Sequence, residues 1–196
     1  MQSAHPNRSH RGEVVVQDVL GATRDELTRV GYRALRIEDV ATRANVNRTT
    51  IYRRWPSKVD LVRATLQWMF AEIPDIEPDT GSFRGDLLVV AREMLTFMLS
   101  PNGQVMIRMV MAEGAEPELR AIMEDLRREK DALLRQMFAR AKARGEIREE
   151  LRQELLLSML VGGVHHRIFA LCVDPVVIDI EEHVDLLLSG ALVRPR

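Results

Sequence analysis

The segment IEDVATRANVNRTTIYRRWPSK, residues 37–58, decides how the first third of this 196-residue chain folds. The apolar residues of 37–44 recur at helical spacing, and Asn45 interrupts them before a second helix that opens at Asn47, a good N-terminal cap. Pro56 disfavours helical geometry at the residue before it, so the second helix is short as well. Two short helices joined by a tight turn have the organisation of a helix-turn-helix.

The second helix of this segment has one apolar and one polar side. Ile51 and Trp55 are four residues apart, and we expect both to face the core. The residues left on the outside are Arg48, Thr49, Thr50, Tyr52 and Arg53. They offer hydrogen-bond donors and methyl groups that can contact thymine, which is the chemistry that reads DNA. The alternative is that the arginines are ordinary surface residues, but a helix this short and polar offers little for packing.

The charge distribution along the chain is uneven. Residues 1–58 contain eleven Lys or Arg and six Asp or Glu, although the net charge of the whole chain is −1. A basic first third on an acidic remainder suits a DNA-binding head, because neutralising phosphates supplies much of the affinity for DNA. Solvated helix faces also carry such an excess, so the charge alone is weak support.

The rest of the chain predicts an all-α protein, because strand-like alternation is almost absent and apolar residues recur at helical spacing. Gly31 is a natural stop for the first helix, and the segment 74–81, with two prolines and a glycine, is the best candidate for a domain boundary. The expected helices cover approximately residues 12–30, 37–44, 47–55, 58–71, 83–100, 103–113, 117–144, 150–172 and 177–192.

Several functional classes find no support in the sequence. No run of about 18 apolar residues predicts a membrane span, and the polar residues 1–11 predict no secretory signal, so we expect a cytoplasmic protein. Cys172 is the only cysteine, which excludes an internal disulfide and a cysteine-based zinc site. An enzyme or carrier is the competing class. However, no metal-ligand spacing, nucleophile–base signature or glycine-rich phosphate loop is present, so we predict no catalytic residue, no metal and no cofactor.

Within its first third the chain resembles the TetR family of transcriptional repressors. The matching strings are VGY at 30–32, IEDVA at 37–41, ANVNR at 44–48 and TIYRRWPSK at 50–58. The resemblance implies about nine helices, three in the DNA-binding head and the others in a dimerising, ligand-sensing body. The domains expected on this basis are a flexible basic arm at 1–11, a helix-turn-helix DNA-binding domain at 12–58, a connecting helix at 59–73 and a ligand-binding and dimerisation domain at 74–196.

The resemblance also implies roles for individual residues. Arg48, Thr49 and Thr50 would lie at base edges or nearby phosphates, Tyr52 and Lys58 would bind the phosphate backbone, and Trp55 with Pro56 would end the recognition helix. The candidate DNA-binding residues are Arg36, Asn47, Arg48, Thr49, Thr50, Tyr52, Arg53 and Lys58.

The chain departs from the family pattern in three ways. Arg36 stands where a threonine or serine usually caps the first helix of the motif; it cannot cap in that way, but it can contact a phosphate. Asn45 replaces the usual glycine of the turn and is the next best residue for a left-handed conformation. Asn47 and Thr49 replace smaller residues, which suggests an operator preference of this chain's own.

The last two helices are the candidates for a dimer interface. A single short recognition helix covers few base pairs, so specificity needs two copies on a palindromic operator. Missing side chains at Gly162 and Gly163 permit close helix approach, and the family resemblance implies an intersubunit four-helix bundle. The apolar residues offered are Leu151, Leu155, Leu156, Met159, Leu160, Val161 and Val164, then Leu186, Leu187, Leu188, Ala191 and Leu192. The alternative is that both helices are internal core.

A small-molecule site is suggested by methionines between residues 94 and 159, because methionine adapts to varied apolar ligands. The tentative ligand-binding residues are Met94, Phe97, Met98, Met109, Met123, Phe138, His165 and Phe169. Such residues also fill ordinary cores. The family resemblance implies a bacterial repressor, associated with the nucleoid through DNA, that a small apolar or amphipathic effector releases. The alternative is a DNA-binding regulator that has no effector.

Overall fold

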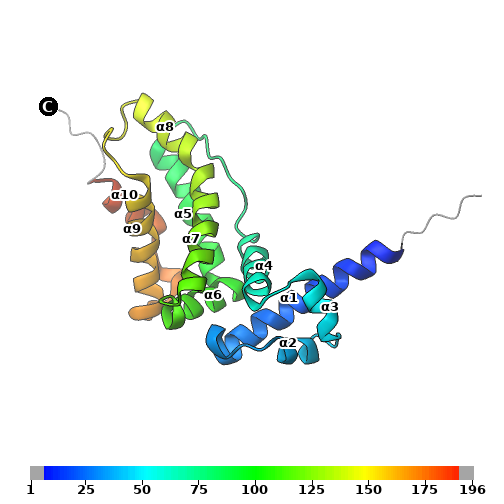
Figure 1. Ribbon diagram of the computed structural model, residues 1–196. Helices are drawn as coiled ribbons and strands as arrows, with labels where there is room; N and C mark the ends of the chain where they lie inside the picture. Colours follow the sequence, from blue (N-terminus) through cyan, green and yellow to red (C-terminus); the bar gives the residue numbers. More distant parts are fainter. Residues whose placement is uncertain (1–6, 190–196) are drawn as a thin grey trace, which may run out of the picture. The chain divides into compact units, whose positions relative to one another are not determined.

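The computed structural model describes residues 7–189, and its regular elements are all helical (Figure 1). This confirms the predicted all-α class. The ten α-helices of the described residues are α1 Asn7–Ala34, α2 Ile37–Arg43, α3 Arg48–Arg54, α4 Lys58–Phe70, α5 Phe83–Leu99, α6 Pro101–Glu113, α7 Pro117–Leu133, α8 Arg135–Ala143, α9 Gln153–His165 and α10 Ile180–Ser189. Among these residues no helix is long and apolar enough to cross a membrane.

The chain forms two compact units. One contains residues up to 72 together with 101–126, and the other contains 73–100 together with 127 onward. Both α6 and the first part of α7 therefore belong to the unit that holds the helix-turn-helix. The predicted division into functional domains at 12–58, 59–73 and 74–196 does not coincide with these units, and it stays a prediction about function.

In the first unit, α1 packs against α2, α4 and α6, and α2 packs against α3 (Figure 1). The helix α1 begins at Asn7, five residues before the predicted start, so 7–11 are helical and only 1–6 of the expected flexible arm lie outside the described residues. Gly31 breaks α1 with φ 78° and ψ 177°, which confirms the predicted stop. Ser57 caps α4 through a reciprocal capping box with Asp60.

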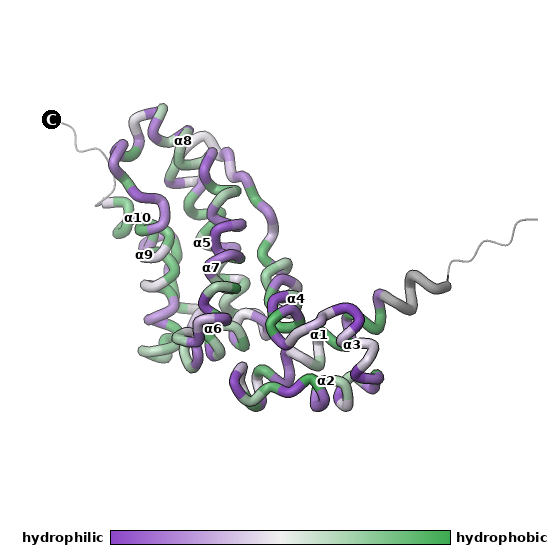
Figure 2. The backbone as a smooth tube through the Cα atoms, viewed as in Figure 1, coloured by the Kyte–Doolittle hydropathy of each residue, from purple (hydrophilic) through white to green (hydrophobic). Residues whose placement is uncertain are grey.

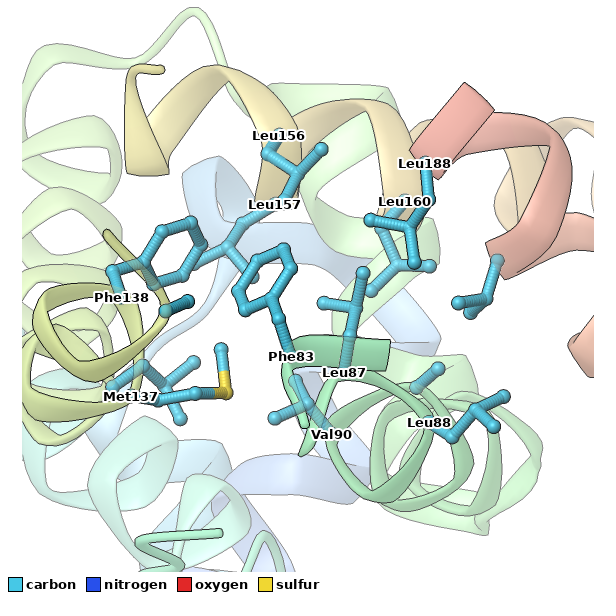
Figure 3. Close-up of a cluster of buried hydrophobic side chains, with 14 of the residues drawn as sticks. Phe83, Leu87, Leu88, Val90, Met137, Phe138, Leu156, Leu157, Leu160 and Leu188 are labelled. Atoms are coloured by element: carbon cyan, nitrogen blue, oxygen red, sulfur yellow. The ribbon is translucent and has the colours of Figure 1, made fainter. Parts of the chain in front are cut away.

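The second unit is built around an apolar core from α5, α8, α9 and α10 (Figure 3). Phe83 and Phe138 meet edge to face, with ring centroids 5.1 Å apart. Gly163 lets α10 approach α9, because a Cβ there would lie only 2.3 Å from the His183 ring. The core residues are Phe83, Leu87, Leu88, Val90, Ala91, Leu134, Met137, Phe138, Ala141, Ile147, Leu156, Leu157, Leu160, Val184 and Leu188.

The helix predicted for 117–144 is divided into α7 and α8 at Leu134. The Asp131 carbonyl accepts a hydrogen bond from the Gln153 side chain at 2.5 Å, and the Leu134 N–H bonds back to the same carbonyl at 3.3 Å. No glycine or proline marks this break. A side chain distant in sequence competes for a helix carbonyl, so periodicity could not reveal it.

The last two predicted helices also differ from the structure. The α9 helix ends at His165, a π-helical turn follows at His166–Ala170, and Cys172 adopts a left-handed conformation with φ 51°. After a 3₁₀ turn at Pro175–Val177, α10 begins at Ile180 rather than at 177. The predicted end of that helix, with Ala191 and Leu192, lies outside the described residues.

Candidate nucleic-acid interface

The turn between α2 and α3 is closed by local backbone hydrogen bonds. Asn45 adopts φ 52°, the left-handed conformation predicted for it. Its N–H bonds to the Thr42 carbonyl at 3.2 Å, and the Val46 N–H bonds to the Ala41 carbonyl at 3.0 Å. This pair of bonds is a Schellman ending, which satisfies the last carbonyls of α2 and sets the direction in which α3 leaves.

The first turn of α3 is held by Asn47. Its Oδ1 atom accepts the backbone N–H of Thr49 at 2.9 Å and also the Thr49 hydroxyl at 2.9 Å. The cap was predicted from sequence and is confirmed. It fixes the start of the helix, and with it the position of the residues that follow.

The polarity of α3 follows the predicted division into two sides. Ile51 is fully buried and Trp55 is 8% exposed, which confirms that both face the core. Thr50 is half-buried, whereas the other polar residues of the helix, Arg48, Thr49, Tyr52, Arg53 and Arg54, are exposed. The structure therefore presents three arginines, a hydroxyl and a phenol on one short helix, and these groups can bind phosphates and base edges.

A buried carboxylate fastens α2 to α1. Glu26 on α1 is almost entirely buried, and its oxygens accept from Arg29 at 2.6 Å and from Arg43 on α2 at 2.7 Å. The hydrogen bond from Arg29, assisted by Arg43, lowers the pKa of Glu26 despite its burial. This ion pair crosses between the two helices and fixes the base on which α3 is held.

The amino group of Lys58 is engaged at the end of α1. It donates to the carbonyl oxygens of Tyr32 at 2.9 Å and Arg33 at 3.3 Å, and it lies 4.5 Å from the centroid of the Tyr32 ring. An ammonium group has three protons, so one remains for a phosphate. Lys58 thus has a structural role that the sequence did not indicate, and the same amino group can still serve the predicted phosphate contact.

Arg36 precedes α2 in an extended conformation and makes no side-chain cap. The exposed guanidinium has the charge and reach for a phosphate, and the first turn of α2 is stabilised instead by Glu38 and Asp39. The absence of the usual cap was predicted and is confirmed.

Three carboxylates at the end of α6 and the start of α7 converge on the end of α1, and the sequence did not indicate them. Glu113 accepts the backbone N–H groups of Tyr32 and Arg33, Glu118 accepts the Tyr32 hydroxyl, and Glu116 pairs with the Arg33 guanidinium. Burial, followed by the Glu118 carboxylate, raises the pKa of Tyr32 well above its ordinary value of 10.0. The partners are about 80 residues apart, so no local pattern could have revealed this cluster.

The tentative ligand-binding residues are divided between the two units. Met109 and Met123 belong to the first, and the other six belong to the second. Phe138 lies in the apolar core of the second unit, Met94 packs against that core, and the rings of His165 and Phe169 are 4.9 Å apart. Core packing accounts for Phe138 and Met94, while a ligand role for any of the eight stays a prediction.

The chain matches two family profiles and several known proteins. Residues 19–65 match "Bacterial regulatory proteins, tetR family", and residues 77–187 match "Tetracyclin repressor-like, C-terminal domain". The regulator AqdR of Rhodococcus erythropolis, described as an HTH-type transcriptional regulator, is 32% identical over 92% of this chain and 86% of its own length. The DNA-binding transcriptional repressor TetR of Mycobacteroides abscessus is 38% identical over 40% of this chain and 41% of its own.

Solved structures agree at the level of fold. A TetR-family transcription regulator from Shewanella sp. PV-4 superposes with a TM-score of 0.73 and 16% identity, covering 92% of this chain and 99% of that one. Both profiles and the relative similar over nearly the whole length lead to one assignment: this chain belongs to the TetR family of DNA-binding transcriptional regulators.

Proposed function

We propose that this protein is a homodimeric repressor that binds a palindromic operator in the bacterial cytoplasm and leaves it when a small apolar or amphipathic effector binds. The observation that carries the proposal is the two-sided α3. Ile51 and Trp55 anchor the helix, and Arg48, Thr49, Tyr52 and Arg53 remain exposed. A helix of this polarity fits the major groove, with its arginines at phosphates and base edges.

The proposed dimer interface is the exposed side of α9 and α10. Leu156, Leu160 and Leu188 of the predicted interface are buried in the core of their own unit, and Val164 is buried as well. Leu151, Val161 and Leu187 are half-buried. The exposed apolar residues of the predicted interface are Leu155, Met159 and Leu186, which are 49%, 53% and 74% exposed.

On α9, Leu155, Met159 and Gly162 are spaced four and three residues apart, so they lie on one face of the helix. Apart from its chain neighbours and the backbone of its own helix, no atom lies within 4 Å of the position where a Cβ on Gly162 would stand. Figure 2 shows α9 coloured largely toward the hydrophobic end of the scale. An apolar face with an open glycine suits a second copy of the same helix, because the missing side chain permits close packing.

We propose that the effector releases the protein from DNA by shifting α6. This helix buries Met106 and Met109, packs against α1 and α4, and ends at Glu113, which holds the end of α1. An effector that binds one position of α6 better than another would shift the end of α1 and, with it, the base of the recognition helix.

The decisive experiment is the selection of bound sequences from random double-stranded DNA by the full-length protein. A palindromic motif with two equivalent half-sites is expected, because a symmetric dimer presents two copies of α3. Enrichment of no sequence would contradict operator binding, and enrichment of a single unpaired half-site would contradict the dimer.

The effector is tested separately on the selected operator. A thermal-shift screen of apolar and cationic compounds should find molecules that raise the melting temperature, and those molecules should lower operator affinity in a fluorescence-anisotropy titration. Stabilising compounds that leave operator affinity unchanged, or silence across a chemically diverse set, would favour a regulator that has no effector.

A further inference from the structure

We propose that Thr49 acts toward DNA as a hydrogen-bond acceptor only, and that it therefore selects a base with an exocyclic amine in the major groove, adenine or cytosine. The inference rests on the proposed placement of α3 in that groove. It concerns the direction of one hydrogen bond, and it makes Asn47 the residue that sets this direction.

The direction follows from the contacts of Asn47. Its Oδ1 atom lies 2.9 Å from the Thr49 backbone nitrogen and 2.9 Å from the Thr49 hydroxyl oxygen. A backbone N–H can only donate, so the side-chain atom that meets it must be the amide oxygen and not the amide nitrogen. An amide oxygen can only accept, so the hydroxyl must donate to it. Both roles are thus assigned by chemistry, without reference to hydrogen positions.

This assignment leaves the Thr49 hydroxyl with nothing to donate. A hydroxyl has one proton, and here Asn47 holds it; the lone pairs and the methyl group remain for DNA. In the major groove the amines of adenine and cytosine are donors, whereas guanine and thymine present oxygen acceptors at the corresponding edge. To contact those acceptors, Thr49 would have to release Asn47 and lose a hydrogen bond, which corresponds to a preference of about three- to tenfold.

Asn47 is a positioning residue in this scheme. Asn47 is exposed, as Thr49 is. Its Oδ1 atom caps the recognition helix, so the hydrogen bond from the Thr49 hydroxyl is present before DNA binds. Without it the hydroxyl could rotate freely and either donate or accept. Thr49 would then accept from adenine or cytosine and donate to guanine or thymine equally well, and the preference at that base pair would be lost.

The test is the selection from random DNA, repeated with four variants of the full-length protein. Wild type should enrich adenine or cytosine at one position of each half-site. Thr49→Val removes the hydroxyl and keeps a methyl group, so the preference should disappear; Thr49→Ser keeps the hydroxyl and should retain it. Asn47→Ala releases the proton, so guanine and thymine should become acceptable at the same position. Asn47→Asp keeps an acceptor at the cap and should retain the amine preference.

The matched control is Thr28→Val. The Thr28 hydroxyl is exposed on α1 and donates to the Arg24 carbonyl at 2.9 Å, away from the recognition helix α3, so the selected motif should not change. Thermal unfolding checks that each variant folds. If Asn47→Ala does not fold, the comparison of Thr49→Val with Thr49→Ser still tests the inference.

The outcomes separate this inference from the proposed function. A wild-type motif in which every position is unchanged by Thr49→Val would overturn the inference and leave operator binding intact. A preference for thymine that Thr49→Val keeps and Thr49→Ser loses would overturn it in favour of a methyl contact. Failure of wild type to enrich any sequence would contradict operator binding itself, and the inference with it.

Discussion

Glu113, the last residue of α6, accepts the backbone N–H groups of Tyr32 and Arg33 at the end of α1. Gly31 interrupts the helix just before them, so these N–H groups have lost their helical partners, and the carboxylate replaces those partners. Glu116 and Glu118 add contacts to the side chains of the same two residues. The end of α1 is therefore held by a segment about 80 residues away.

Replacing Gly31 should destabilise the protein for two independent reasons. Its φ of 78° with ψ of 177° belongs to a region that is essentially restricted to glycine, and an added Cβ would lie 2.9 Å from the Glu113 carboxylate oxygens. Gly31→Ala should lower the free energy of unfolding by about 1–3 kcal/mol in urea titration. Gly21→Ala is the control, because Gly21 lies inside α1 and, apart from its chain neighbours and the backbone of its own helix, no atom lies within 4 Å of an added Cβ. It should be neutral or stabilising by up to about 1 kcal/mol; equal losses in both variants would contradict the assigned role of Gly31.

The ion pairs of Glu26 should make the free energy of unfolding decrease as the pH falls into the acid range. Because the folded state lowers the pKa of Glu26 below its ordinary value of 4.5, the stability that this carboxylate contributes is complete above pH 4.5 and is lost as the pH falls through the lowered pKa.

Glu26→Gln removes that dependence and should cost about 1–3 kcal/mol at pH 7, since a buried charged acceptor is lost while its two arginines stay partly exposed. Denaturant unfolding at pH 7 and at pH 3.5 gives both values. The exposed Glu13→Gln on the same helix should change stability by less than about 0.5 kcal/mol at either pH. A Glu26→Gln variant whose stability falls with acid as steeply as that of wild type would refute this assignment.

Lys58→Met should affect both stability and DNA binding. Losing the bonds to the Tyr32 and Arg33 carbonyls should lower the free energy of unfolding by about 1 kcal/mol. Losing a phosphate contact should lower the slope of log affinity against log salt concentration by about 1.

Lys142→Met is the matched control, because Lys142 also donates to a backbone carbonyl, that of Glu149, but in the other unit. It should reduce stability and leave the salt slope unchanged. If Lys58→Met behaves in the same way, Lys58 is structural and makes no phosphate contact.

A charge on the exposed side of α9 should separate the proposed dimer. Met159→Glu places a carboxylate within an apolar face and should give monomers in sedimentation velocity at micromolar concentration, with operator affinity reduced by more than tenfold. Met111→Glu makes the same change at a methionine that is 68% exposed on α6, and it should leave the dimer intact. Dimers of unchanged stability in the Met159→Glu protein would move the interface away from α9.

Local chemistry made the helix-turn-helix predictable. The cap at Asn47, the left-handed Asn45 and the capping box at Ser57 involve partners within a few residues, so each is legible in a short string. The burial of Ile51 and Trp55 follows from helical periodicity alone. The sequence also determined the all-α class and, through the matching strings, the family.

Long-range contacts decided what periodicity could not. The interruption at Leu134 depends on Gln153, the capping role of Lys58 depends on the carbonyls of α1, and the division of apolar residues on α9 between core and surface depends on which helices cover them. The amino-acid sequence by itself determined the caps and the turn of the helix-turn-helix and which side of α3 is polar, because these depend on neighbours along the chain. Only the tertiary structure decided that Glu113 would hold Tyr32, because that contact exists only once α6 has packed against α1.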